Sequence, residues 1–84
     1  MIRGTVRDVD GRPLANARVM VSAAPAPVPD IAALTDAEGA FGLEAQGTGS
    51  YELAIVADGY GRVEVAVDVD DLGEAEVNAV LEPL

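Results

Sequence analysis

Carboxylates are the chemically active side chains that this sequence offers in quantity. The densest group is the acidic run from Asp68 to Glu76, which holds three Asp and two Glu. Calcium is bound by several carboxylate and carbonyl oxygens on a flexible loop, so the run predicts a weak cation site. Its ligands would be Asp68, Asp70, Asp71 and Glu74.

The match of this run to a helix-loop-helix calcium loop is partial. Asp68 and Asp70 suit the first and third ligand positions, but Leu72 stands at the fifth and Ala79 at the twelfth, where a Glu is required. The alternative interpretation is a solvated turn between two strands. A similar weak pattern around Asp8 is explained more simply by bonds from the carboxylate to nearby backbone amides.

Paired carboxylates can also act as a general acid and a general base. Asp36 with Glu38, and Glu74 with Glu76, are the closely spaced pairs of this kind. A glycosidase pair needs a deep, shaped pocket, and a chain of 84 residues rich in Val and Ala has little volume for one. We therefore expect a protein that is not an enzyme.

The residue types that are missing exclude most other chemistry. The sequence contains no His, Cys, Lys or Trp. Without Cys there is no disulfide, thiolate nucleophile or zinc-thiolate site, and without His there is no imidazole base or ligand. Ser-His-Asp and Cys-His catalysis are therefore excluded.

The charge balance argues against polyanionic partners. Fifteen acidic residues face five Arg, which gives a formal net charge of −10. Contacts to phosphates need clustered Lys or Arg, so we expect no nucleic-acid binding. The longest uncharged stretch, residues 19–29, contains three prolines and is too short to span a bilayer, so we expect no membrane insertion.

The first residues of the sequence do not indicate a cellular compartment. Met1-Ile2-Arg3-Gly4 lacks the basic and then apolar run of a signal peptide. An internal domain of a secreted protein would begin in the same way. Both a cytoplasmic and an extracytoplasmic location therefore fit the sequence.

The elements that must position these side chains are strands. Apolar residues recur with a period of two, which is typical of half-buried strands. The expected strands are residues 2–7, 17–23, 31–35, 40–45, 51–57, 62–69 and 77–82. We expect Asp36 to Gly39 to close a hairpin between the third and fourth strands, with Gly39 in the left-handed conformation. Seven short strands without a crossover helix predict one domain over residues 1–84, a seven-stranded antiparallel β-sandwich of the all-β class.

The most distinctive exposed segment is the Pro-rich stretch from Ala24 to Asp30, which favours a stiff polyproline path. One interpretation is docking to a partner protein through Pro25, Pro27, Val28, Pro29 and Ile31. The other is a rigid strap that covers a sheet edge. Unpaired edge strands would also allow self-association with a second copy, which the net charge opposes at low salt.

Two tyrosines also have two interpretations. Exposed Tyr51 and Tyr60 would stack on a carbohydrate, whereas buried or corner tyrosines would bond their hydroxyls to backbone. Their positions, at a strand start and after a turn, favour the second interpretation.

Four motifs follow one another along the chain. They are Gly4-x-Val6-x-Asp8-x-x-Gly11-x-Pro13-Leu14-x-x-Ala17-x-Val19, Thr35-Asp36-x-x-Gly39-x-Phe41-x-Leu43, Tyr51-x-Leu53, and Ala57-x-Gly59-Tyr60. Together they resemble the carboxypeptidase regulatory-like domain over essentially the whole chain. The resemblance implies a prealbumin-like (transthyretin-like) Greek-key sandwich, related to the B-type repeats of bacterial surface adhesins.

The resemblance also implies a function. In metallocarboxypeptidases this domain is an appendage without catalytic residues. Related adhesin repeats carry a Lys isopeptide bond, and related ureide hydrolases need His, and this chain has neither residue. We expect a non-catalytic structural or protein-interaction module whose role depends on a host chain or another protein, without a cofactor. The alternative is a binder of calcium or carbohydrate through residues 68–76 or the exposed tyrosines.

Overall fold

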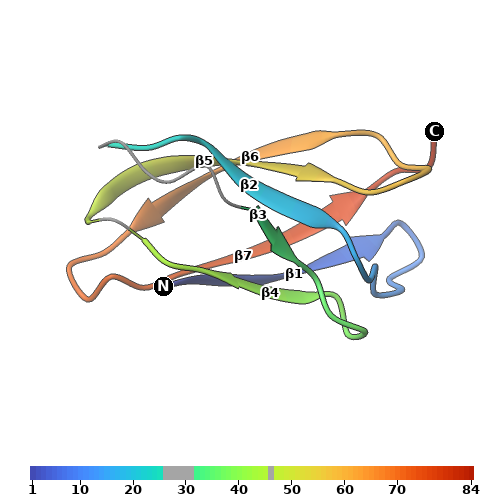
Figure 1. Cartoon of the computed structure of the whole chain (residues 1–84), viewed down its shortest axis with the longest axis horizontal. Helices are drawn as coiled ribbons and strands as arrows, with labels where there is room; N and C mark the ends of the chain where they lie inside the picture. Colours follow the sequence, from blue (N-terminus) through green and yellow to red (C-terminus); the bar gives the residue numbers. More distant parts are fainter. Residues whose placement is uncertain (26–31, 46) are drawn as a thin grey trace.

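The computed structural model describes residues 1–25, 32–45 and 47–84, which form seven strands in two sheets (Figure 1). The strands are β1 (Ile2–Asp8), β2 (Arg18–Ala23), β3 (Ala32–Leu34), β4 (Ala40–Leu43), β5 (Gly49–Val56), β6 (Val63–Val69) and β7 (Ala75–Leu81). A three-stranded sheet has the order β4-β1-β7, and a four-stranded sheet has the order β3-β2-β5-β6. The expected all-β class and the seven strands in two sheets are confirmed.

The alternation of side chains decides which face of each strand meets the core. In β1, Ile2 and Val6 are fully buried while Arg3 and Arg7 are exposed. Phe41 lies in the same core at 7% exposure. The largest side chains with almost no exposure are Tyr51, Ile2, Leu53, Ile55, Leu81, Val6 and Val19. Removing this apolar surface from water is the main force that holds the two sheets together.

The three-stranded sheet contains a parallel pair, so the expectation of an entirely antiparallel sandwich is wrong. β1 pairs with β4 in antiparallel fashion and with β7 in parallel fashion, from Ile2 opposite Ala75 to Asp8 opposite Leu81. The arrows of successive strands point in opposite directions (Figure 1). The first and seventh strands therefore run the same way, and any sheet that makes them neighbours must pair them in parallel.

The expected hairpin between the third and fourth strands is also wrong, because β3 and β4 belong to different sheets. The Thr35 amide donates at 3.0 Å to the carbonyl of Ala17, the residue directly before β2 of the four-stranded sheet. Four residues later the Gly39 carbonyl accepts the Val6 amide of β1 at 2.8 Å. The left-handed conformation expected at Gly39 is confirmed, with φ of 74°.

The sandwich is elongated, with principal extents of 34 × 19 × 17 Å. Figure 1 places residue 1 and residue 84 towards opposite ends of the long axis. This follows from the parallel pair, because β1 begins at the end of the molecule where β7 begins, and β7 finishes at the other end.

Candidate functional site

One five-residue turn occurs three times, at residues 8–12, 36–40 and 70–74, and each copy is built on an Asp carboxylate. In every copy an Asp Oδ1 accepts the amides of the second and fourth following residues at 2.9–3.0 Å. The Gly at the fourth position donates its amide to the Asp carbonyl and has positive φ. Asp satisfies backbone donors in this way and Gly adopts positive φ without a steric penalty. The interpretation of Asp8 as a turn residue is confirmed.

The acidic run is divided among separate structural tasks. The Asp70 carboxylate caps its turn, Asp68 accepts the Ser50 hydroxyl at 2.6 Å, and a Glu74 carboxylate oxygen lies 3.9 Å from the amino group of Met1. Within residues 1–25, 32–45 and 47–84, no three His, Cys, Asp or Glu side chains gather where they could hold a metal ion. The geometry therefore gives no support to calcium ligation by Asp68, Asp70, Asp71 and Glu74.

The closely spaced carboxylate pairs, Asp36 with Glu38 and Glu74 with Glu76, all lie at exposed positions. Asp36 accepts the amides of Glu38 and Ala40, so its side chain is committed to the turn. Glu74 and Glu76 are both exposed. A pair that transfers protons needs a shared, shielded substrate site, whereas these side chains are open to solvent.

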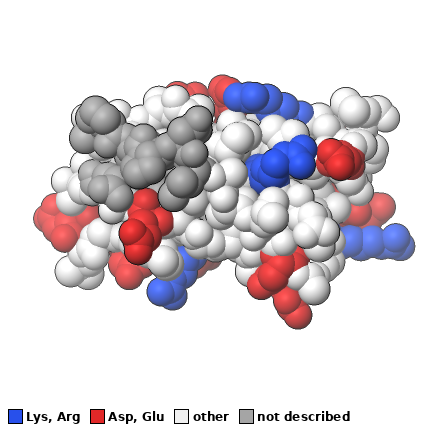
Figure 2. All heavy atoms as spheres, in the orientation of Figure 1, with Lys and Arg blue, Asp and Glu red and all other residues white. Residues whose placement is uncertain are grey.

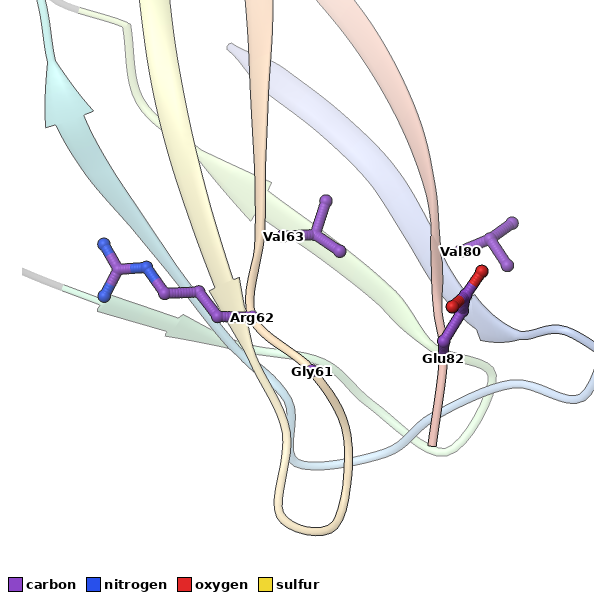
Figure 3. Close-up of a pocket in the computed structure, with 5 residues that line it drawn as sticks. All are labelled: Gly61, Arg62, Val63, Val80 and Glu82. Atoms are coloured by element: carbon purple, nitrogen blue, oxygen red, sulfur yellow. The ribbon is translucent and has the colours of Figure 1, made fainter. Parts of the chain in front are cut away.

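A pocket of about 220 Å³ lies where the beginning of β6 approaches the end of β7 (Figure 3). It is lined by Gly61, Arg62, Val63, Val80 and Glu82. In Figure 3 Val63 points towards β7 while Arg62 points to the opposite side of β6. The Arg62 guanidinium bonds to a Glu64 carboxylate oxygen at 3.1 Å. Glu82 is the one acidic residue among the described residues that line the pocket.

The same region joins the two sheets at one end. The Gly61 amide donates to the Glu82 carbonyl at 2.8 Å, and the Leu84 amide donates to the Gly59 carbonyl at 3.0 Å. β6 and β7 are edge strands of different sheets. These two bonds close the sandwich beyond the pocket.

Stacking of a carbohydrate on an exposed Tyr51 is wrong, because this side chain is only 2% exposed. Its hydroxyl donates to the Gly47 carbonyl at 2.7 Å, which confirms the alternative of a buried tyrosine bonded to backbone. Tyr60 is half-buried against the core and pairs with Pro83 in an isolated bridge.

Most of the Pro-rich segment lies outside the described residues, and this holds for Pro27, Val28, Pro29 and Ile31. Pro25 is exposed and lies over the backbone of Gly49, where an added Cβ would come within 2.9 Å of the Pro25 Cγ. Docking of a partner protein through this segment stays a prediction.

Two residues with structural tasks were not identified from the sequence. Thr35 is 3% exposed, donates its hydroxyl to the Leu14 carbonyl at 2.6 Å and accepts the Ala17 amide at 2.9 Å. The motif that begins with Thr35 singles this residue out, but the local sequence does not show that its side chain is buried. At Gly4, an added Cβ would overlap the carbonyl oxygen of Val77 in β7. An isolated Gly inside a strand pattern is the signal that could have suggested this close approach.

The charged surface is mixed. On the face that Figure 2 shows, the basic side chains stand among acidic and uncharged ones instead of forming a continuous patch. Arg18 lies 3.4 Å from Asp58, so at least two Arg side chains, counting Arg62, have acidic partners. In the part of the chain that the structure describes, no helix is long and apolar enough to cross a membrane.

Comparison with known families identifies the class of this sandwich. The family model of the carboxypeptidase regulatory-like domain matches residues 1–82. The chain belongs to this family, a regulatory-like and non-catalytic domain, and the resemblance drawn from the four motifs is confirmed. A search of curated proteins returned no match.

Solved structures share the fold at low sequence identity. A chain of a type II Cohesin-X-Dockerin complex from Acetivibrio cellulolyticus superposes with a TM-score of 0.69 at 17% identity, covering 95% of this chain and 55% of that one. The 3-chlorocatechol 1,2-dioxygenase of Rhodococcus opacus gives 0.71 at 15% identity, covering 99% and 59%. The chlorocatechol 1,2-dioxygenase of Pseudomonas putida gives 0.61 at 14% identity, covering 96% and 58%. This chain thus spans little more than half of each neighbour, and the likeness is one of fold alone.

Proposed function

We propose that this chain is a non-catalytic accessory module that serves a host chain or a partner protein as a spacer and interaction domain. The observation that carries the proposal is the use of the carboxylates. Three Asp side chains are bonded into backbone turns, and the candidate acid pairs lie on open surface. The candidate acids are therefore either bonded into turns or exposed to solvent.

The shape of the molecule supports the spacer role. The body is 34 Å long, and the two termini of the chain lie towards opposite ends of its long axis (Figure 1). Insertion into a longer chain would therefore place the flanking parts on opposite sides of the sandwich. The fold neighbour from a cohesin and dockerin assembly supports a role among interacting modules by analogy. The proposal includes a Greek-key, prealbumin-like connectivity. It is supported by the loops at residues 35–39 and 70–74, each of which takes the chain from one sheet to the other.

The test is an activity screen on the purified chain with matched variants. Ester, amide and glycoside model substrates are incubated with the wild type, with Asp36→Asn and Glu38→Gln, and with Glu74→Gln and Glu76→Gln. We expect no turnover above buffer in any sample. Turnover proportional to protein concentration that disappears in one of the acid variants would overturn the proposal.

A further inference from the structure

The two strands nearest the ends of the chain are direct hydrogen-bonding neighbours. β1 and β7 pair in parallel from Ile2 opposite Ala75 to Asp8 opposite Leu81, without a shift of register. Because the strands run in the same direction, residue 1 lies at one end of this ladder and residue 84 lies beyond the other (Figure 1). The termini are thus joined across the molecule by one continuous set of backbone bonds.

This arrangement fixes how tension between the termini is distributed. Strands lie along the line of pull, and the bonds between them run across it. All bonds of the ladder are loaded together, so the strands separate only when several break at once. A single backbone bond contributes little net stability, so the resistance comes from simultaneous loading and appears in the rate of forced unfolding.

β1 is held on both sides. Its other neighbour is β4, in an antiparallel register from Ile2 opposite Leu43 to Thr5 opposite Ala40. Any sliding of β1 along its axis must break both ladders. The inward side chains Ile2 and Val6 have no exposed surface, so sliding would also drag them out of the packed core.

Two side-chain features tighten the pair. The Thr5 hydroxyl donates to the Asn78 side-chain oxygen at 2.8 Å, between residues that face each other in the register. Gly4 has no Cβ to hold the strands apart at Val77. β1 can therefore lie close against β7 while a side-chain bond reinforces the backbone ladder.

No covalent cross-link reinforces this pair. The chain has no Cys for a disulfide and no Lys for a cross-link between side chains. Load applied to the ends must therefore be carried by packing and by the two ladders that hold β1.

We propose that the domain bears tension between its ends, with the β1–β7 ladder as the clamp that resists it. The inference rests on the proposed role as a spacer within a longer assembly. It adds a property that a spacer does not need, which is a resistance to unfolding that depends on the direction of pull.

The test is single-molecule force spectroscopy along two axes of the full chain. Because the sequence has no Cys, pairs of introduced thiols define the points of attachment. Met1→Cys with Leu84→Cys loads the ladder along its length. Val9→Cys with Leu84→Cys attaches both handles beyond the same end of the β1–β7 pair, so its bonds break one after another. All these positions are exposed, and chemical denaturation checks that both double variants keep the same midpoint.

At one loading rate we expect a several-fold higher unfolding force along the first axis. Thr5→Val removes the bond to Asn78 and should lower the force on the first axis without changing it on the second. Thr48→Val, at an exposed position outside the ladder, should change neither.

Equal forces along the two axes, or a loss from Thr5→Val that is the same on both, would overturn the clamp. That result would leave the spacer proposal standing, because a spacer need not resist force. Conversely, turnover lost in the acid variants would remove the proposed function and would not alter the force comparison.

Discussion

β6 has the most regular alternation of any strand in the sequence, whereas β1 interrupts its own pattern with Gly4. The burial of the inward side chains does not follow the regularity of the pattern. Ile2 and Val6 of β1 are fully buried, while the three inward valines at the beginning and middle of β6 are only half-buried. Those valines are Val63, Val65 and Val67.

The difference lies in the neighbours of each strand. β1 is the central strand of its sheet, between β4 and β7, and β6 is the edge strand of the other sheet. The inward side of β6 also borders the pocket beside β7. Alternation therefore reports which face of a strand points inward, and the number of flanking strands decides how completely that face is covered.

The largest effect that would test this comparison is expected at Gly4. Gly4→Ala places a Cβ against the Val77 carbonyl, so β1 and β7 must separate. The expected loss is more than about 4 kcal/mol, against a total stability of about 4–12 kcal/mol for a chain of this length. Denaturant unfolding, or failure to fold by circular dichroism, measures it.

Gly42→Ala is the matched control. Gly42 lies in β4 of the same sheet, opposite Arg3 of β1. A Cβ at this position would lie 3.5 Å from the Met1 Sδ, which is an ordinary van der Waals contact. Its stability should change by less than about 1 kcal/mol. Equal losses from the two variants would contradict the close approach of β1 and β7.

A pair of valine truncations addresses burial directly. Val6→Ala in β1 should cost about 2 kcal/mol, because two buried methyl groups are lost and a cavity remains. Val65→Ala in β6 should cost less than about 1 kcal/mol, since the side chain is half-exposed. Urea unfolding midpoints, evaluated at a common m-value, compare the stability losses of the two variants. A larger loss from Val65→Ala than from Val6→Ala would show that the edge strand is covered in solution.

The turns that follow the two strands provide a smaller effect. Asp8→Ala and Asp70→Ala each remove a carboxylate that accepts two amides, and each should cost about 1 kcal/mol, as loss of a helix cap does. The losses should be equal, because the bonds are local to each turn and do not depend on the burial of the strand before it. Asp71→Ala, an exposed neighbour, should lie within about 0.5 kcal/mol of the wild type, and thermal unfolding of the three variants decides.

The smallest effect is expected from calcium. A cation bound by the acidic run after β6 would stabilise the folded state by mass action. The Asp70 carboxylate is already engaged by two amides, so we expect no change in Tm between millimolar calcium and EDTA. A concentration-dependent rise in Tm that Asp71→Ala abolishes would restore the calcium prediction.

The number of strands and their inward faces could be predicted from the sequence because alternation is a local property. Which strands pair with one another could not be predicted in this way. The hairpin expected around Asp36 is wrong because Thr35 and Gly39 bind different sheets, and their partners lie far away in the sequence. The parallel pairing of β1 with β7 likewise depends on which strands become neighbours.

The same division holds for the candidate site. The turn role of Asp8 could be predicted, because Asp and Gly at this spacing satisfy each other's backbone groups locally. The burial of Thr35 could not, since its partners Leu14 and Ala17 are reached only after folding.

The repeated turn has a consequence for how this surface can change during evolution or engineering. In each copy, the Asp and the Gly reverse the chain, and the side chains at the second and third positions have no part in closing it. Val9 and Leu72, at such positions, are 56% and 85% exposed. Exposed turn tips are where sequence changes and insertions are best tolerated. Residues 9–10, 37–38 and 71–72 are thus open to diversification, like the variable loops of a display scaffold, while the strands beneath them remain constant.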